Sequence, residues 1–81
     1  MQPVQVIAGG HSYTFYRGPG HTPLDVAEFG RRKAWPDRDP QAPLEVRCEA
    51  GHLLNGAAAA DPVSLAGRDL LYVTLPVGVG G

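Results

Sequence analysis

The 81-residue sequence is poor in several features on which other classes of protein depend. It has one cysteine, Cys48, so no disulfide can form within the chain, and we expect the fold to depend on hydrophobic burial. No apolar run approaches the roughly 20 residues of a membrane-spanning helix. Residues 1–6 lack the charged region and long apolar stretch of a signal peptide. We therefore expect a soluble, cytoplasmic protein with no membrane partner.

An excess of charge is also missing, because 7 basic side chains stand against 8 acidic ones. Arg31, Arg32 and Lys33 form the only basic cluster, and we expect it to be a solvated helix end that complements the helix dipole. Phosphate backbones call for a broad basic surface, so we expect no nucleic-acid partner. A chain this short has room for one small core and no large substrate pocket, which argues against a self-sufficient enzyme.

The reactive side chains do not form a pattern typical of catalysis or of metal binding. The three histidines are dispersed at expected turns without the spacing of metal ligands, so we expect them on the surface. They are His11, His21 and His52. Cys48 alternates with Leu44 and Val46, which favours a buried structural cysteine over a nucleophile. We expect no catalytic residue, no metal and no cofactor.

The first sixteen residues predict an antiparallel hairpin. Apolar side chains alternate over residues 4–8 and again over residues 13–16, and Gly9-Gly10 separates the two runs. Pro3 lies where a proline is tolerated, at the first residue of a strand.

A helix is expected to begin after Thr22. Thr22 is the predicted N-cap, Pro23 takes the first helical position and Asp25 the capping-box position. Trp35-Pro36 prevents continuation much beyond Lys33. The expected inward face carries Val26, Phe29 and Gly30, with Leu24 or Ala27 at its margin.

The second half of the chain predicts further strands after a proline-rich loop at residues 36–43. Period-2 alternation over residues 44–49 indicates a half-buried strand, and residues 52–54, before the Asn55-Gly56 turn, are short enough to be a minor edge strand. Residues 57–65 make an irregular crossing. In the final strand, residues 69–75, Leu71, Val73 and Leu75 face one way and Leu70, Tyr72 and Thr74 the other. One mixed sheet of four to five strands, with one helix packed across it, satisfies this α+β order.

The predicted domain spans residues 1–75, and residues 76–81 follow it as a free tail. Pro76 stops further pairing, and Gly80 and Gly81 end the chain. With no Cβ near the terminal carbonyl, such a tail is thin enough to enter a narrow active-site channel.

This order of elements, with the last strand leading into Gly80-Gly81, resembles the β-grasp fold of the ubiquitin-like proteins. The resemblance also includes the hairpin after Met1-Gln2, the helix opened by Thr22, and residues 44–56 as a third strand, tight turn and short strand. The sequence is most similar to the bacterial ubiquitin-like modifiers found beside E1-, E2- and deubiquitinase-like genes.

The resemblance implies a role as the substrate of other enzymes. An E1-like enzyme would adenylate the carboxylate of Gly81, and a cysteine of that enzyme would then take the acyl group as a thioester. The implied partners are this E1-like enzyme, an E2-like conjugating enzyme, a deubiquitinase-like protease and target proteins, with antiviral defence as the implied pathway.

Two departures from ubiquitin change these expectations. Val77-Gly78-Val79 replaces the arginines of the ubiquitin tail, so the surfaces that recognise this tail are expected to be more apolar. Lys33 is the only lysine and hence the one candidate acceptor lysine, which argues against extended lysine-linked chains. Tyr16, Tyr72 and Thr74, on the wet face of the sheet, are candidate anchors for a partner.

Two other functions fit the same residues. A sulfur carrier would use the same adenylate to form a thiocarboxylate at Gly81. A β-grasp interaction module would use its surface, and the diglycine would be incidental.

Overall fold

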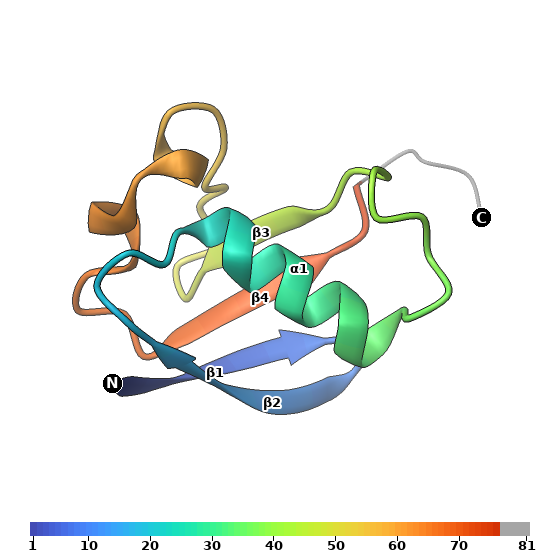
Figure 1. Cartoon of the computed structure of the whole chain (residues 1–81), viewed down its shortest axis with the longest axis horizontal. Coiled ribbons are helices and arrows are strands. Elements are labelled where there is room, and N and C mark those ends of the chain that lie inside the picture. The colour runs from blue at the N-terminus through green and yellow to red at the C-terminus, as the bar shows by residue number, and fades with distance from the viewer. Residues whose placement is uncertain (77–81) are drawn as a thin grey trace.

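The computed structural model describes residues 1–76, and their elements follow the expected order (Figure 1). The predictions for Val77 to Gly81 concern residues outside this described part. The elements are β1 (Gln2–Ala8), β2 (His11–Arg17), α1 (Pro23–Ala34), β3 (Glu45–Cys48), the short 3-10 helices η1 (Ala58–Ala60) and η2 (Pro62–Leu65), and β4 (Leu70–Thr74).

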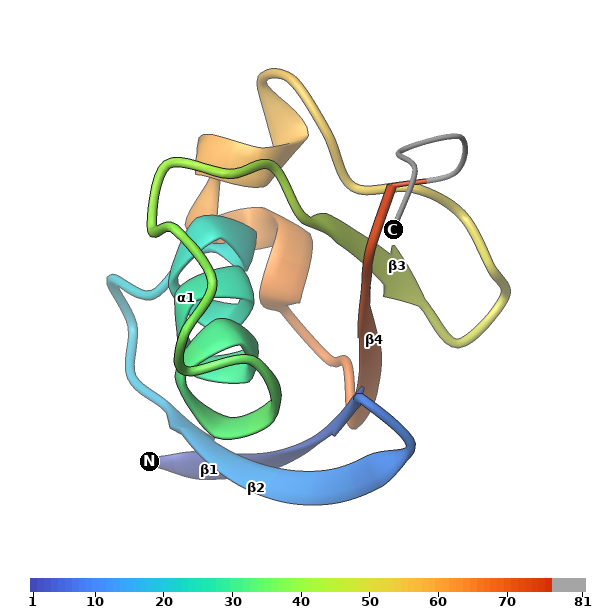
Figure 2. The same cartoon turned by 90° about the vertical axis from the view of Figure 1, so that its right-hand side faces the viewer.

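Within residues 1–76, four strands form one mixed sheet in the order β2-β1-β4-β3. β1 pairs antiparallel with β2 and parallel with β4, and β3 pairs antiparallel with β4. Helix α1 lies across one face of this sheet (Figure 2). The predicted α+β fold of the β-grasp type is therefore confirmed, with four strands.

The hairpin turns at Gly9 and Gly10 as predicted. Their φ angles are +59° and +82°, which is the left-handed region that a two-residue type I′ turn needs at both positions. The turn also packs against the end of the helix, because a Cβ on Gly9 would lie 2.9 Å from the Cβ of Ala34. Glycine at position 9 thus serves both the turn and the packing.

Helix α1 begins where the sequence predicts. The backbone N–H of Thr22 donates to Oδ2 of Asp25 at 2.8 Å, and Pro23 is the first helical residue. The helix ends at Ala34, one residue beyond the predicted end, and the N–H of Trp35 donates to the carbonyl of Arg31 at 2.8 Å.

The basic cluster at the end of the helix is only in part the solvated face that its composition predicts. The side chain of Arg31 is buried, and its guanidinium contacts the carboxylate of Glu28 at 2.5 Å. It also donates to the carbonyls of Pro36 and Arg38, at 3.5 and 3.2 Å. Arg31 therefore fastens the proline-rich loop to the helix, while Arg32 and Lys33 stay exposed.

Two strand predictions also need correction. Residues 52–54 do not form a separate strand but pair with β3 through an isolated bridge between Leu53 and Arg47. Two backbone hydrogen bonds flank it, from Cys48 N–H to the carbonyl of His52 at 3.0 Å and from Leu54 N–H to the carbonyl of Val46 at 2.8 Å. Leu75 lies beyond the end of β4 and is 40% exposed, so it does not face the core with Leu71 and Val73 as predicted.

The core lies between the sheet and α1. It consists of the buried side chains of Val4, Val6, Ala8, Val26, Val46, Cys48, Leu65, Leu71 and Val73. The inward residues of the strands contribute, as predicted, and η2 adds Leu65 to close one end. On the helix, Val26 and Gly30 are buried as expected, and Phe29 packs against the core from its edge. Leu24, by contrast, is 57% exposed.

In the part of the chain described here, no helix has the length and apolar character needed to cross a membrane.

Candidate functional site at the end of strand β4

Strand β4 is an interior strand of the sheet, and it carries two of the three residues predicted as anchors for a partner, while Tyr16 lies on the edge strand β2. Tyr72 has Ile7 on β1 and Arg47 on β3 as its register partners, and Thr74 has Glu45 on β3. Both side chains alternate with the buried Leu71 and Val73, so they lie on the face of the sheet away from α1. Each is half-buried. The structure thus brings Tyr72 and Thr74 together on one surface, as predicted.

The surface around Tyr72 has an apolar centre with polar borders. Across the sheet, one row of register partners runs through Ser12, Ile7, Tyr72, Arg47 and Leu53. Toward β3, Arg47 contacts Glu45 at 3.2 Å and donates to the carbonyl of Gly51 at 3.0 Å.

A short polar network closes the other border, toward β2. The amide of Gln5 donates to Thr14 Oγ1 at 3.2 Å and accepts from Ser12 Oγ at 2.9 Å. An apolar centre within a polar rim is the usual anatomy of a protein-binding surface. We call the row from Ser12 to Leu53, with Thr74, the outer-face row.

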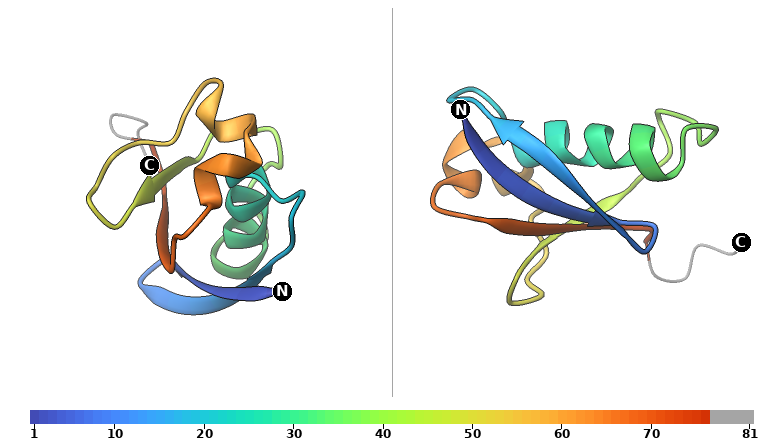
Figure 3. Two further views of the ribbon diagram at one scale, coloured as in Figure 1. Left: turned by 90° about the vertical axis from the view of Figure 1, so that its left-hand side faces the viewer. Right: turned by 90° about the horizontal axis from the view of Figure 1, so that it is seen from below.

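The tail that this strand leads into is beyond the described residues. The predicted activation residues Gly80 and Gly81 and the predicted recognition residues Val77, Gly78 and Val79 all lie there. The last described residues are the exposed Leu75 and the half-buried Pro76. Figure 3 shows that β4 ends at the side of the sheet opposite to the amino terminus.

Lys33, the candidate acceptor lysine, does not belong to the outer-face row. It lies in the last turn of α1, on the layer that covers the opposite face of the sheet. Its Nζ lies 5.8 Å from the centroid of the Phe29 ring, within the range of a cation–π contact. The side chain is exposed, so its amine is accessible to an acylating enzyme.

Cys48 is buried in the core, at 3% exposure, as expected of a structural cysteine. Burial acts to raise the pKa of its thiol, but hydrogen bonds from the backbone of Ala50 and His52, aided by the charge of Arg68, lower it overall. A thiol without access to a substrate has no use as a nucleophile, whatever its pKa.

The three histidines lie at separate places in the fold. His11 and His52 are exposed, as predicted, whereas His21 is half-buried, and its Nδ1 accepts a hydrogen bond from the backbone N–H of Gly18 at 2.8 Å. Among residues 1–76, no three His, Cys, Asp or Glu side chains come together in a group that could hold a metal ion.

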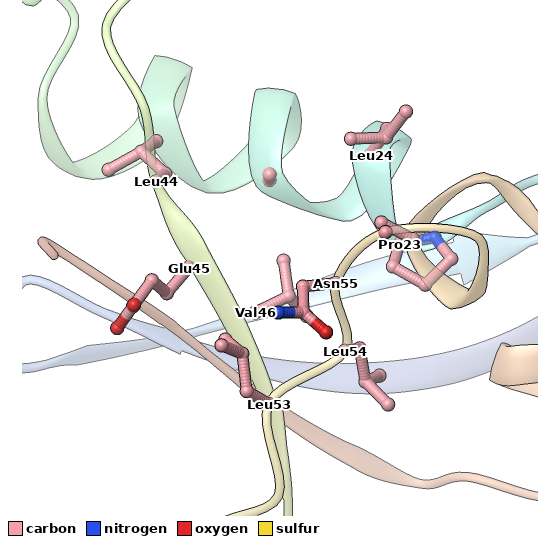
Figure 4. Close-up of a pocket in the computed structure, with 11 residues that line it drawn as sticks. Pro23, Leu24, Leu44, Glu45, Val46, Leu53, Leu54 and Asn55 are labelled. Carbon is pink, nitrogen blue, oxygen red and sulfur yellow. The ribbon is translucent and has the colours of Figure 1, made fainter.

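A second surface feature, which the sequence does not predict, is a groove between α1 and β3. It consists of two adjoining hollows of about 320 and 240 Å³. Leu24, Ala27 and Leu44 line both hollows, and Leu53, Leu54 and Asn55 form a wall of the larger one (Figure 4). We call it the α1–β3 groove. The one signal in the sequence is Leu24, a large apolar residue at the margin of the predicted inward face.

The fold and the position of the outer-face row define a small β-grasp protein whose last strand is held between two neighbours. Neither a family model nor a curated protein sequence matches the chain.

Proposed function

We propose that this protein is a ubiquitin-like modifier, which an E1-like enzyme activates at Gly81 and which is then conjugated to target proteins. The observation that supports the proposal is the placement of β4. β4 is paired on both sides, with β1 and β3, and Pro76 follows its last residue by only two positions. Residues 77–81 are therefore attached to one of the most firmly held strands of the fold.

The proposed chemistry divides between this chain and its partners. A carboxylate does not react with amines at neutral pH, so the Gly81 carboxylate must first attack the α-phosphorus of ATP and release pyrophosphate. A thiolate of the enzyme then attacks the acyl-adenylate carbonyl, AMP leaves, and a target amine finally displaces the thiol. This chain supplies the carboxylate and a docking surface. The catalytic groups belong to its partners, which are the E1-like enzyme, an E2-like enzyme and a deubiquitinase-like protease.

The outer-face row is the surface best suited to the activating enzyme. It crosses the strand that carries the tail, and Tyr72 lies two residues before Thr74 at that strand's end. Aromatic side chains with polar neighbours are typical anchors of protein interfaces. An enzyme docked on this row would therefore hold the tail at a fixed distance from its own active site.

The scarcity of lysine favours one alternative, the sulfur carrier. Six of the seven basic residues are arginines, so Lys33 alone offers an amine on a side chain for chain formation. A sulfur carrier needs no acceptor amine, because sulfur replaces an oxygen of its own Gly81 carboxylate. A third role, as an interaction module, would use the outer-face row without any activation of the tail.

Intact-mass analysis of the protein and its adducts, recovered from its native host, separates these functions. Attachment of Gly81 to lysines of other proteins supports the modifier. A sulfur-for-oxygen mass gain on the free protein supports the sulfur carrier. A free, unmodified terminus, found even with an E1-like enzyme and ATP present, rules out both.

The matched variants for this experiment are Gly81→Ala and Gly20→Ala. Gly81→Ala is expected to slow activation because its methyl group obstructs the attacking nucleophile. A Cβ on Gly20 would point into open space, and Gly20 lies far from β4 in sequence, so Gly20→Ala is expected to leave conjugation unchanged. Equal adduct yields from the two variants would contradict a role for Gly81 as the reacting residue.

A further inference from the structure

The α1–β3 groove is an apolar surface that shares one residue, Leu53, with the outer-face row. Its rim residue Leu24 is 57% exposed, although it lies directly beside the buried Pro23. Leu24, Ala27 and Leu44 are common to the two hollows, so the groove is continuous along the helix. A continuous groove of this shape suits a linear apolar ligand.

The charged side chains along the groove are already paired. Glu28 contacts Arg31 at 2.5 Å and Arg32 at 3.2 Å. Glu45, on the opposite wall, contacts Arg47 at 3.2 Å. A charged ligand would have to displace these contacts, whereas an uncharged one leaves them intact. The groove therefore favours a segment without charge.

The chain itself contains such a segment in residues 76–79, which precede the charged Gly81 carboxylate that the proposed chemistry uses. This segment has no charged side chain, and its two valines, Val77 and Val79, are two residues apart. In an extended backbone, side chains at this spacing point the same way and lie about 7 Å apart. Two valines on one side of the segment suit two adjoining hollows that share Leu24, Ala27 and Leu44. Asn55, whose side-chain amide lies at the wall of the larger hollow (Figure 4), offers a hydrogen-bonding partner for an extended backbone.

The same molecule is poorly placed to fill its own groove. Thr74, at the end of β4, has Glu45 of β3 as its cross-strand partner, so the backbone of β3 lies between the end of β4 and the groove. Residues 40–44, which line the smaller hollow in part, lead into β3 at that point (Figure 2). A second molecule meets no such obstruction.

We propose that the α1–β3 groove binds the Val77–Val79 segment of a second copy of this chain, which gives a reversible head-to-tail self-association. The interface is heterologous, with the groove on one molecule and the tail on the next. This self-association does not require activation of Gly81, so the experiment that tests it is independent of the proposed conjugation. Where both occur, self-association and the activating enzyme compete for the same tail.

The test is a dilution series of the ¹⁵N-labelled full chain, followed by NMR from about 1 mM down to about 20 μM, a range that covers weak association. The amide signals of Leu24, Ala27, Leu54 and Asn55 are expected to shift with concentration together with those of Val77 and Val79. Both sets should fit one dissociation constant.

Three variants locate the two halves of the interface. Leu24→Asp places a charge on the groove rim, and an acidic residue in the first helical turn is compatible with folding. Val77→Asp places a charge on the tail. Val63→Asp, at a valine that is 74% exposed on η2 and does not line the groove, is the matched control. The first two are expected to weaken association by about tenfold or more, and the control to leave it unchanged.

A mixture of Leu24→Asp and Val77→Asp tests whether the tail of one molecule binds the groove of another, because the first variant retains an intact tail and the second an intact groove. The mixture is expected to associate more strongly than either variant alone. The proposal is overturned if the groove signals do not depend on concentration, if Val77→Asp associates like the wild type, or if tail and groove contact each other independently of concentration, which would indicate binding within one molecule.

Discussion

Gly30 of helix α1 lies against Val73 of strand β4 so closely that a Cβ on the glycine would be 3.0 Å from the Cβ and both γ-methyl groups of the valine. The missing side chain at position 30 therefore sets how near the helix can come to the sheet. It does so over β4, the strand that leads to the tail.

Gly30→Ala is expected to destabilise the protein by about 1 kcal/mol. The overpacked methyl group costs about 1–3 kcal/mol, which exceeds the gain of about 1 kcal/mol from the better helix propensity of alanine. Urea unfolding measures the difference, with Gly20→Ala as the control in open space. A Gly30→Ala protein that is more stable than the wild type would show that the helix and Val73 can move apart freely.

The ion pair between Glu28 and Arg31 predicts a loss of stability in acid. The hydrogen bond from Arg31, with help from Arg32, lowers the pKa of Glu28 from 4.5 to about 2. In the unfolded chain this carboxylate takes up a proton near pH 4.5, but in the folded protein it stays ionised until about pH 2. Its contribution to the free energy of unfolding is thus complete above pH 4.5 and is lost as the pH falls through 2.

Urea unfolding of wild type and Glu28→Gln between pH 5 and pH 2 checks this prediction. The wild type is expected to be the more stable of the two at pH 5, and the difference should shrink toward pH 2. Glu49→Gln, at a 53% exposed carboxylate that lies 3.5 Å from Arg68, is the matched control. A difference between wild type and Glu28→Gln that stays constant over this range would contradict the assignment.

Cys48 is expected to react slowly with thiol reagents in the native protein, in spite of its lowered pKa. Its side chain is 3% exposed, so the reagent reaches it mainly after the chain opens. Native labelling should be at least about 100-fold slower than labelling in urea, as for a site that opens with about 3 kcal/mol or more. Labelling at the same rate in both conditions would place Cys48 on the surface.

Tyr72→Ala is expected to reduce the yield of Gly81 adducts in the native host, if the outer-face row is the docking surface for the activating enzyme. Truncation of an aromatic anchor commonly costs about 2 kcal/mol or more of binding, so the yield should fall by about tenfold or more at limiting enzyme. Tyr16→Ala is the matched control, because Tyr16 is 59% exposed on the same face but lies on the edge strand β2. Equal losses in both variants would show that the row has no special role.

The features that the sequence predicts correctly are those that neighbouring residues determine. Thr22, Pro23 and Asp25 fix the start of α1 within one turn of chain, and Gly9-Gly10 permits only a tight hairpin. The inward residues of the strands follow from period-2 alternation. The same alternation predicts Tyr72 and Thr74 on the outer face without any knowledge of which strands pair.

The features that it misses depend on contacts between distant segments. Arg31 is buried because the loop at residues 36–43 returns over it and presents two carbonyls, and a local pattern of three basic residues does not indicate this. The groove forms because residues 53–59 pack beside α1. Leu24 therefore lines the groove and is not part of the core. The tail residues, on which the proposed chemistry depends, lie beyond the described chain, so their roles stay predictions.

The parallel pairing of β1 with β4 also has a mechanical consequence. The first strand and the last are neighbours that run in the same direction, and Gln5 N–H donates to the carbonyl of Asp69 at 2.8 Å where they meet. A motor that pulled on Pro76 while the amino terminus was held would drag the two strands past each other. All the hydrogen bonds between them would then carry the load together, whereas a hairpin pulled from its open end gives way one bond at a time. A force applied at Pro76 thus acts along β1 and β4, the direction in which the hydrogen bonds between these two strands resist it best.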